Sequence, residues 1–135
     1  MTESERDLAK LLADLQPVLS PDRYAFVATD NSTFDDGVFA LVREDEGVAV
    51  IRVDPAGEWA RISLGVHSSL DAVGMTAALS RALAEAGISA NVVAGLHHDH
   101  IFVPRDRREL ALKVLQDLGG SKIDRNVIAL AAIVG

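Results

Sequence analysis

The sequence contains no cysteine, which excludes disulfide bonds, thiolate catalysis and any metal site built from cysteine ligands. Aromatic residues are scarce as well, with one Trp, one Tyr and four Phe among 135 residues. No apolar run reaches the roughly 18 residues that a membrane-spanning helix needs. The polar N-terminus also lacks the basic and apolar segments of a signal peptide. We therefore expect a cytoplasmic protein that does not associate with a membrane.

Basic residues are outnumbered, and the acidic excess is concentrated in the first part of the chain. The net charge is −7, and residues 1–57 carry 12 acidic against 5 basic side chains. The only basic cluster is Arg105, Arg107 and Arg108, and no run of aromatic residues accompanies it. Because phosphate contacts supply most of the affinity for nucleic acids, this distribution argues against nucleic-acid binding.

The first 57 residues combine one amphipathic helix with several short strands. Leucines at positions 8, 11, 12 and 15 form a single apolar stripe, which predicts a helix over residues 4–16 that Ser4 caps and Pro17 ends. Apolar runs predict strands over residues 24–28, 38–42 and 48–53. The acidic segment between the last two strands is typical of a hairpin turn. Its acidic residues do not show the sequence spacing that is typical of metal ligands. A solvated hairpin tip is therefore favoured over a metal site.

The rest of the sequence predicts alternating strands and helices after a turn at residues 54–57, which we take as a domain boundary. The expected elements are a strand over 60–66, a helix over 71–86 that ends at Gly87, strands over 91–96 and 101–103, and a helix from Pro104 to Gly119. The predicted parts are an N-terminal half (1–57), a C-terminal domain (58–118) and a tail (119–135).

The tail is almost wholly apolar from residue 126 onward, and its composition fits a helix or a strand equally well. Such a run is unfavourable in water. It is therefore expected to pack on the body, to supply a fourth strand at a sheet edge, or to enter a subunit interface.

Four segments resemble the ACT-domain family. They are SSLDAVGM (68–75), ALAEAGISANVV (82–93), HDHIFVP (98–104) and TDNSTFDDGVFALVREDEG (29–47), the last followed by Trp59. The resemblance is to uncharacterised bacterial proteins with two ACT domains and, more distantly, to the ACT repeats of animal cytosolic arginine sensors. It implies an α+β fold in which a ferredoxin-like βαββαβ ACT domain follows a smaller ACT-like half, with antiparallel sheets and helices on one face.

The resemblance also implies a ligand site at the loop between the first strand and the first helix of the ACT domain. In the family an amino acid lies against this loop, where N–H groups at a helix N-terminus suit a carboxylate. Gly74 would allow close approach of the ligand or tight packing of the helix. Asp99 matches an acidic ligand-binding position of the arginine sensors. The predicted ligand-binding residues are His67, Ser68, Ser69, Val73, Gly74, Met75, His98, Asp99 and His100.

The histidine-rich stretch HHDH leaves other interpretations open. The first and third strands of a ferredoxin-like sheet are antiparallel neighbours, which would bring His67 near His98 and His100. These three histidines could then bind zinc or nickel. Ser68 or Ser69 with a His–Asp pair could support catalysis, although the sequence contains no Gly-x-Ser-x-Gly motif. The stretch could also be a solvated polar turn.

We therefore expect a non-catalytic regulatory protein that binds an amino acid or a similar small molecule and changes its assembly or a partner's activity. No cofactor is expected. One clear ACT unit without a catalytic domain predicts a homodimer, with the alanine-rich helix 71–86 and the tail as candidate contacts. The alternatives are a metal-binding protein that uses the histidines and an interaction module without a small ligand, with an unidentified protein partner.

Overall fold

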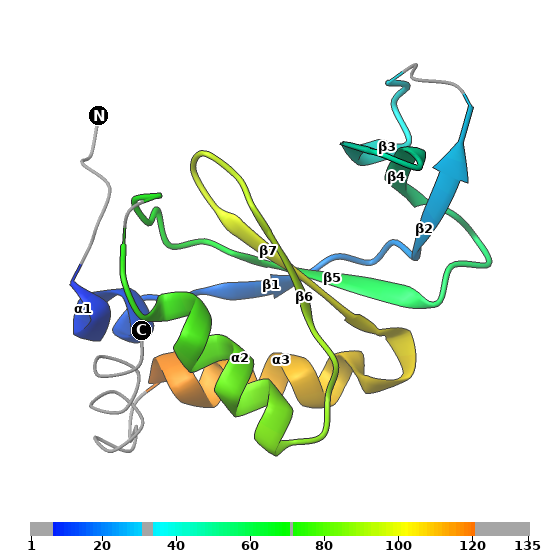
Figure 1. Ribbon diagram of the computed structural model, residues 1–135. Coiled ribbons are helices and arrows are strands. Elements are labelled where there is room, and N and C mark those ends of the chain that lie inside the picture. The colour runs from blue at the N-terminus through cyan, green and yellow to red at the C-terminus, as the bar shows by residue number, and fades with distance from the viewer. Residues whose placement is uncertain (1–6, 31–33, 71, 121–135) are drawn as a thin grey trace.

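The computed structural model describes residues 7–30, 34–70 and 72–120 (Figure 1). Its elements are α1 (Leu8–Ala13), β1 (Pro17–Leu19), β2 (Tyr24–Thr29), β3 (Val38–Glu44), β4 (Gly47–Val53), β5 (Trp59–Leu64), α2 (Met75–Glu85), β6 (Asn91–Ala94), β7 (Asp99–Pro104), the 3-10 turn η1 (Arg105–Arg107) and α3 (Arg108–Gly120). This order confirms the α+β class and the β3–β4 hairpin. The tail from residue 121 onward and Ser4 lie outside the described residues.

The strands of the described residues form one antiparallel sheet of seven strands rather than two separate sheets. Their order is β3-β4-β2-β5-β7-β6, and β1 also pairs with β5. β7 pairs with one edge of β5, and β1 and β2 share the other edge. On that edge β1 reaches Leu64 at the end of β5, whereas β2 pairs with Trp59 at its start. β1 thus takes the place of the fourth strand in a βαββαβ sheet, a position for which the sequence had offered the tail as a candidate.

In the part of the chain that the structure describes, three helices cover one face of the sheet and form the main core. α1, α2 and α3 contact one another, and they lie together below the strands in Figure 1. Their apolar stripes pack against Ile62, Leu64, Ile101 and Val103; the stripes consist of Leu11, Leu12, Met75, Ala78, Leu79, Leu83, Ala111, Leu115 and Leu118. Residues before and after the turn at 54–57 therefore share one core. The division of the chain at that turn stays a prediction.

The first helix is shorter than its leucine pattern predicts. It begins after Asp7, whose carboxylate accepts a hydrogen bond from the backbone N–H of Lys10 at 3.2 Å. It ends at Ala13 because Pro17 disfavours helical conformations in the residue before it. That residue, Gln16, has a positive φ of 50°, which turns the chain from α1 into β1.

A second core fills the opposite face of the sheet, where β2, β3 and β4 stand away from the helices (Figure 1). Side chains alternate along β7, so Phe102 points away from the helix face that Ile101 and Val103 occupy. Five of the six aromatic residues meet here in edge-to-face contacts. The pairing of β3 with β4 skips Phe39, and this bulge accompanies the packing of its ring on Phe102.

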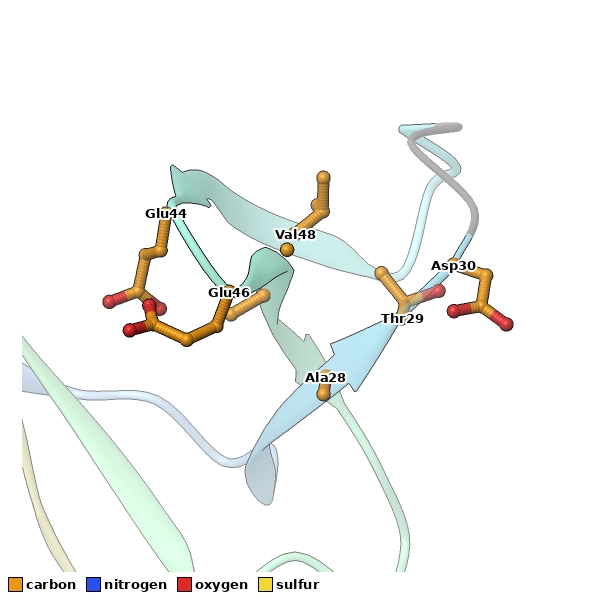
Figure 2. A pocket seen from close by; sticks show the side chains of 8 residues that line it. Ala28, Thr29, Asp30, Glu44, Glu46 and Val48 are labelled. Carbon is orange, nitrogen blue, oxygen red and sulfur yellow. The ribbon is translucent and has the colours of Figure 1, made fainter.

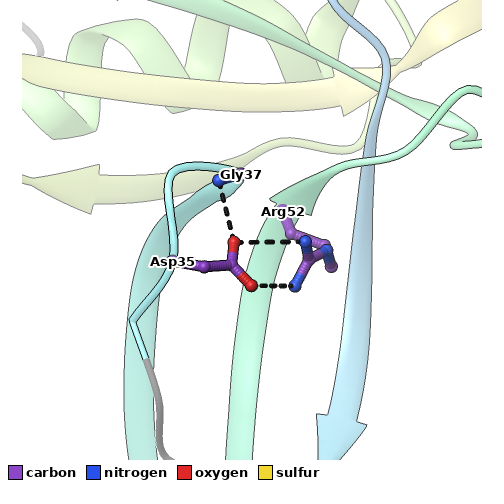
Figure 3. A network of polar contacts seen from close by, with 3 residues as sticks. All are labelled: Asp35, Gly37 and Arg52. Atoms are coloured by element: carbon purple, nitrogen blue, oxygen red, sulfur yellow. Dashed lines mark hydrogen bonds and ion pairs between the residues drawn. The ribbon is translucent and has the colours of Figure 1, made fainter.

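The chain enters β3 through a small polar network that Figure 3 shows. The Asp35 carboxylate accepts hydrogen bonds from the Gly37 N–H at 2.8 Å and from the two terminal nitrogens of Arg52 at 3.3 and 3.4 Å. The Gly37 N–H first, and the Arg52 guanidinium second, lower the pKa of Asp35 from its usual value. The network ties the loop before β3 to β4.

Candidate functional site

Two loops meet at the corner of the sheet where β5 ends and β7 begins. The last register pair of these strands is Ser63 with His100. Beyond it, the Ser68 hydroxyl donates a long hydrogen bond of 3.4 Å to the Asp99 carboxylate, and both residues are buried. The expected proximity of the β5 end and the β7 start is confirmed.

A small cavity of about 80 Å³ opens at this corner. It lies between the β5–α2 loop, the first turn of α2 and the facing ends of β6 and β7. Four of its lining residues were predicted from the sequence, namely Ser68, Ser69, Met75 and Asp99. The other four are Leu70, Ala72, Thr76 and Ala94. Leu70 and Ala72 fall inside the SSLDAVGM segment, whereas no signal in the sequence marks Thr76 or Ala94.

Asp99 is the buried ionisable group of this cavity. Its side chain is only 9% exposed, and no Lys or Arg among the described residues forms an ion pair with it. Burial raises the pKa of the Asp99 carboxyl above its usual value of 3.8, and the Ser68 hydrogen bond and the nearby charge of His98 only partly oppose this rise. A cationic group that entered the cavity would therefore stabilise the ionised carboxylate.

The first turn of α2 begins at the cavity through Gly74. This residue is the N-cap of the helix and has φ 96° and ψ −19°, a left-handed conformation that favours glycine. Its conformation directs the chain from the loop into α2, whose first residues Met75 and Thr76 line the cavity. Val73, which was also predicted, is more than half exposed and does not line it.

Three histidines gather beside the cavity, but they are not the three that the sequence suggested. His67 and His97 are joined by a ring nitrogen contact of 3.2 Å, and the ring centres of His67 and His98 are 6.0 Å apart. His98 also contacts the Val66 carbonyl at 3.2 Å. His97 was not among the predicted site residues, although the HHDH stretch contains it.

His100 lies on the other face of β7 and is not part of this cluster. Its Nδ1 is 2.7 Å from the Ser63 hydroxyl, and its ring packs on Phe39 with centres 4.9 Å apart. Burial, followed by the charges of Arg61 and His98, lowers the pKa of His100 below its usual value. β7 begins at Asp99, so Asp99 and His100 alternate to opposite faces.

The metal site formed by His67, His98 and His100 is therefore a wrong prediction, because the sheet separates His100 from the other two. In the part of the chain that the structure describes, no group of three His, Asp or Glu side chains is placed to hold a metal ion. The same finding applies to the acidic hairpin tip.

The acidic hairpin tip borders a second cavity, of about 280 Å³, between the end of β2 and the β3–β4 turn. Figure 2 shows the carboxylates of Glu44 and Glu46 close together, whereas Asp30 lies apart from them on the far side of β2. This arrangement agrees with a solvated tip.

None of the described helices is long and apolar enough to cross a membrane.

Comparison with known proteins agrees with this geometry. Residues 56–117 match one model of the ACT domain, and residues 3–62 match a second one. A protein of unknown function from Vibrio cholerae, described as a possible transport protein, is 39% identical over 80% of this chain and 92% of its own, with a TM-score of 0.67. The chain belongs to the ACT-domain family. ACT domains are regulatory modules that bind small molecules such as amino acids.

Two more distant structures share the fold of this ACT protein. A protein from Agrobacterium tumefaciens is 22% identical over 73% of this chain and 82% of its own, with a TM-score of 0.55. The ligand-free regulatory subunit of aspartate kinase from Thermus thermophilus is 13% identical over 77% of this chain and 96% of its own, with a TM-score of 0.53. No curated protein matches the sequence significantly.

Proposed function

We propose that this ACT protein is a cytoplasmic, non-catalytic regulator that binds an amino acid in the cavity between Ser68 and Asp99. The observation that carries the proposal is the buried Asp99 carboxylate, which faces a cavity at the N-terminus of α2 and has no cationic partner among the described residues. An amino acid supplies both groups that such a cavity favours, an ammonium for Asp99 and a carboxylate for the helix N-terminus.

The size of the cavity defines which part of the ligand it holds. Its volume of about 80 Å³ is well below the ~300–1,000 Å³ typical of pockets that enclose a whole ligand. We assign it to the ammonium and carboxylate groups, whereas the ligand side chain extends past Leu70, which lines the cavity and is largely exposed. The identity of that side chain then depends on what covers the mouth.

A regulatory rather than catalytic role agrees with the hydrogen bonds at this corner. The Ser68 hydroxyl donates to Asp99, and His98 contacts the Val66 carbonyl rather than a serine. A nucleophilic serine needs a base such as histidine within hydrogen-bond distance, and Ser68 is paired with a carboxylate instead. Ligand binding to one of two loop conformations would change the surface that a protein partner meets.

A thermal-shift screen against the common amino acids tests the proposal. An amino acid at 100 times its dissociation constant stabilises the folded state by about 2.7 kcal/mol, which should raise the melting temperature by several degrees. Replacing Asp99 by asparagine removes the partner of the ammonium group and should weaken binding about tenfold or more. Asp45→Asn, at the hairpin tip, makes the same chemical change on an exposed residue and should leave the response unchanged.

The opposite outcomes of the screen are equally informative. If no amino acid raises the melting temperature, or if Asp99→Asn responds like the wild type, the amino-acid site is not between Ser68 and Asp99. Zinc and nickel salts on the same plate, with a chelator as the reverse control, should produce no shift that depends on the histidines.

The raised pKa of Asp99 makes a separate prediction for stability in the absence of ligand. Above its ordinary value of 3.8, the unfolded carboxyl loses its proton while the folded one keeps it until a higher pH. The folded state then binds more protons, so stability falls as the pH rises through this window. Asp99→Asn should therefore melt at a higher temperature than the wild type at pH 7, and the difference should shrink towards pH 4. A wild type that melts higher at pH 7 would contradict this sign.

We also propose that the two loops at this corner form a contact between two copies of the chain. Leu70, Val73 and Leu96 lie in these loops, and each is more than half exposed, an arrangement common at protein interfaces. The exposed positions of α2 are mainly polar, including Ser80, Arg81 and Glu85. The loops are therefore better candidates for the contact than the helix that the sequence suggested.

Size-exclusion chromatography with light scattering tests this dimer. The wild type should elute as a dimer, and Leu96→Ser should weaken the dimer about tenfold or more, because each copy loses a leucine that is buried on association. Val18→Ser is a suitable control, since Val18 is similarly exposed but lies in β1. A monomeric wild type, or a dimer that Leu96→Ser leaves intact, would refute the contact.

A further inference from the structure

A third cavity lies at the other end of β5, away from Ser68 and Asp99. Its volume is about 540 Å³, within the range of pockets that hold a whole small ligand. Its lining residues are Arg23, Glu58, Trp59, Ser89, Pro104, Arg105 and Asp106. Trp59 and Leu64 are the two ends of β5, so the two cavities are separated by the length of that strand, roughly 17 Å at ~3.3 Å per residue.

Backbone carbonyls rather than carboxylates hold the two arginines of this lining, Arg23 and Arg105, and also the neighbouring Arg108. Arg23 donates its Nε–H to the Gly57 carbonyl at 2.7 Å, and Arg105 donates from Nη1 to the Asp22 carbonyl at 3.3 Å. Arg108, on the first turn of α3, donates from Nη1 to the Arg105 carbonyl at 2.8 Å. Among the described residues none of the three forms an ion pair.

These anchored guanidinium groups are suited to bind an oxyanion. Each carries five N–H donors, of which the bonds above use one, and the remaining donors match the oxygens of a phosphate or a carboxylate. Burial, followed by the like charges of Arg108 and Arg23, lowers the pKa of Arg105 from its usual value. The other two cations therefore repel Arg105, and an anion between Arg23 and Arg105 would relieve that repulsion.

The carboxylates of Glu58 and Asp106 line the same cavity and limit which anions it accepts. Together with Arg23 and Arg105 they give the lining a formal charge of zero, in a chain whose net charge is −7. A bare anion therefore gains little from long-range attraction. The ligand must bring further contacts, such as hydroxyl or amino groups that donate to these carboxylates.

Trp59 supplies an apolar surface for such contacts. Phe26 packs edge to face on its indole, with ring centres 5.3 Å apart, which holds the indole in place on one side. The indole is partly exposed, and it lines the same cavity as Arg23 and Arg105. A flat ring packed on an indole gains both apolar burial and ring–ring attraction.

We infer that this cavity is a second binding site, for a small molecule that combines a flat ring with a phosphate or carboxylate group. Arg23 and Arg105 bind the oxyanion, Trp59 packs against the ring, and Glu58 and Asp106 accept hydrogen bonds from polar groups of the ligand. The site is independent of the amino-acid cavity, because the two share no lining residue.

The single tryptophan allows a direct test, because Trp59 gives the only indole N–H signal in a proton–nitrogen NMR spectrum. AMP and benzoate combine a ring with a phosphate and with a carboxylate, respectively. At least one of them should shift the indole signal saturably, and which one does so identifies the oxyanion. Adenosine lacks the anion and inorganic phosphate lacks the ring, so each should bind about tenfold or more weakly than the active probe.

Matched variants locate the binding. Arg105→Gln should weaken the active probe about tenfold or more. Arg43→Gln makes the same change on the exposed end of β3 and should have no effect. Arg105→Lys keeps the charge without the planar donors and should bind with an intermediate affinity, provided that its spectrum shows a folded protein. Asp99→Asn should bind the active probe like the wild type, which separates this site from the proposed amino-acid site.

Three results would overturn the inference. In the first, neither AMP nor benzoate shifts the indole signal. In the second, the folded Arg105→Gln variant binds the active probe as tightly as the wild type. In the third, Asp99→Asn abolishes the shift, which would place the bound probe in the other cavity.

Discussion

Replacement of Phe102 by alanine is expected to lower the free energy of unfolding by about 3–5 kcal/mol, the usual range for a large buried aromatic side chain. Phe102 is 0% exposed and lies at the centre of the second core. Its ring contacts Tyr24, Phe26 and Phe39 edge to face, with ring centres 5.4, 5.6 and 5.4 Å apart. Alanine would remove all three contacts and leave a cavity that the strands cannot close without moving.

Thermal and urea denaturation measure this loss. With a total stability of about 5–15 kcal/mol for a domain of this size, the variant should melt roughly 10 °C or more below the wild type. Phe34→Ala is the matched control, because Phe34 is 60% exposed and its loss should cost less than about 1 kcal/mol. Similar losses in the two variants would show that the ring cluster contributes little to stability.

The same variant shows whether β2, β3 and β4 unfold independently of the helix-covered part of the sheet. β2 meets β5 only at the pair Tyr24–Trp59 in the described register, so the aromatic cluster supplies much of the contact between the two parts. Hydrogen exchange in Phe102→Ala should therefore accelerate most at the amides of β3 and β4, while those of β5 and β7 stay protected. Uniform acceleration would indicate that the whole sheet opens as one unit.

Gly57→Ala is expected to destabilise the protein by about 2–3 kcal/mol, because overpacking against backbone cannot be relieved by a side-chain rotation. A Cβ at this position would lie 2.3 Å from the carbonyl oxygen of Tyr24 and 2.5 Å from its carbonyl carbon. Gly57 is also fixed on both sides, since its N–H donates to the Asp54 carbonyl at 2.8 Å and its own carbonyl accepts from Arg23 at 2.7 Å. The turn therefore cannot shift without the loss of these bonds.

Gly47→Ala provides the contrast that separates a clash from backbone strain. Gly47 has a φ of +136°, but no atom lies within 4 Å of a Cβ placed there. Its replacement should cost about 1 kcal/mol from backbone strain alone. Urea denaturation of both variants should rank Gly57→Ala as the less stable one. If the order is reversed, the Tyr24 backbone moves aside more readily than its two strand pairings suggest.

The Gly57 contact also bears on the arginine-lined cavity. It brings the chain around Tyr24 against the start of β5, which places Arg23 beside Trp59. A shift of this turn in Gly57→Ala would separate the two residues that the second binding site requires. The variant should then lose the indole response to the active probe even where it remains folded.

Much of the fold follows from local patterns. Apolar periodicity, the alternating strands and the glycine at position 87 predicted the helices and strands of the second half, and Gly87 adopts the positive φ of 74° that a helix end favours. The SSLDAVGM and HDHIFVP segments led to Ser68, Ser69, Met75 and Asp99, which line one cavity. The predicted elements were confirmed because each depends on a few neighbouring residues, whereas the ligand-binding role of these four residues stays a prediction.

The histidines show where this reasoning failed. The sequence suggested a strand over residues 101–103, but β7 begins at Asp99. This two-residue difference places His100 within the strand, where its side chain alternates to the face opposite Asp99 and pairs with Ser63. Patterns of apolar residues define the middle of a strand well and its ends poorly, because backbone pairing with a neighbouring strand decides where the strand starts.

The sequence by itself determined the family, the order of the described elements other than β1, and the corner that holds Asp99, because all of these are encoded in periodicity and in short motifs. Only the tertiary structure decided that β1 fills the edge of β5, and that Arg23 joins Trp59 and Arg105 around a cavity. An apolar stripe specifies which face of an element is buried, but not which distant segment covers it. That choice depends on how strands pair across the whole chain, and here it creates the cavity in which we propose a second ligand.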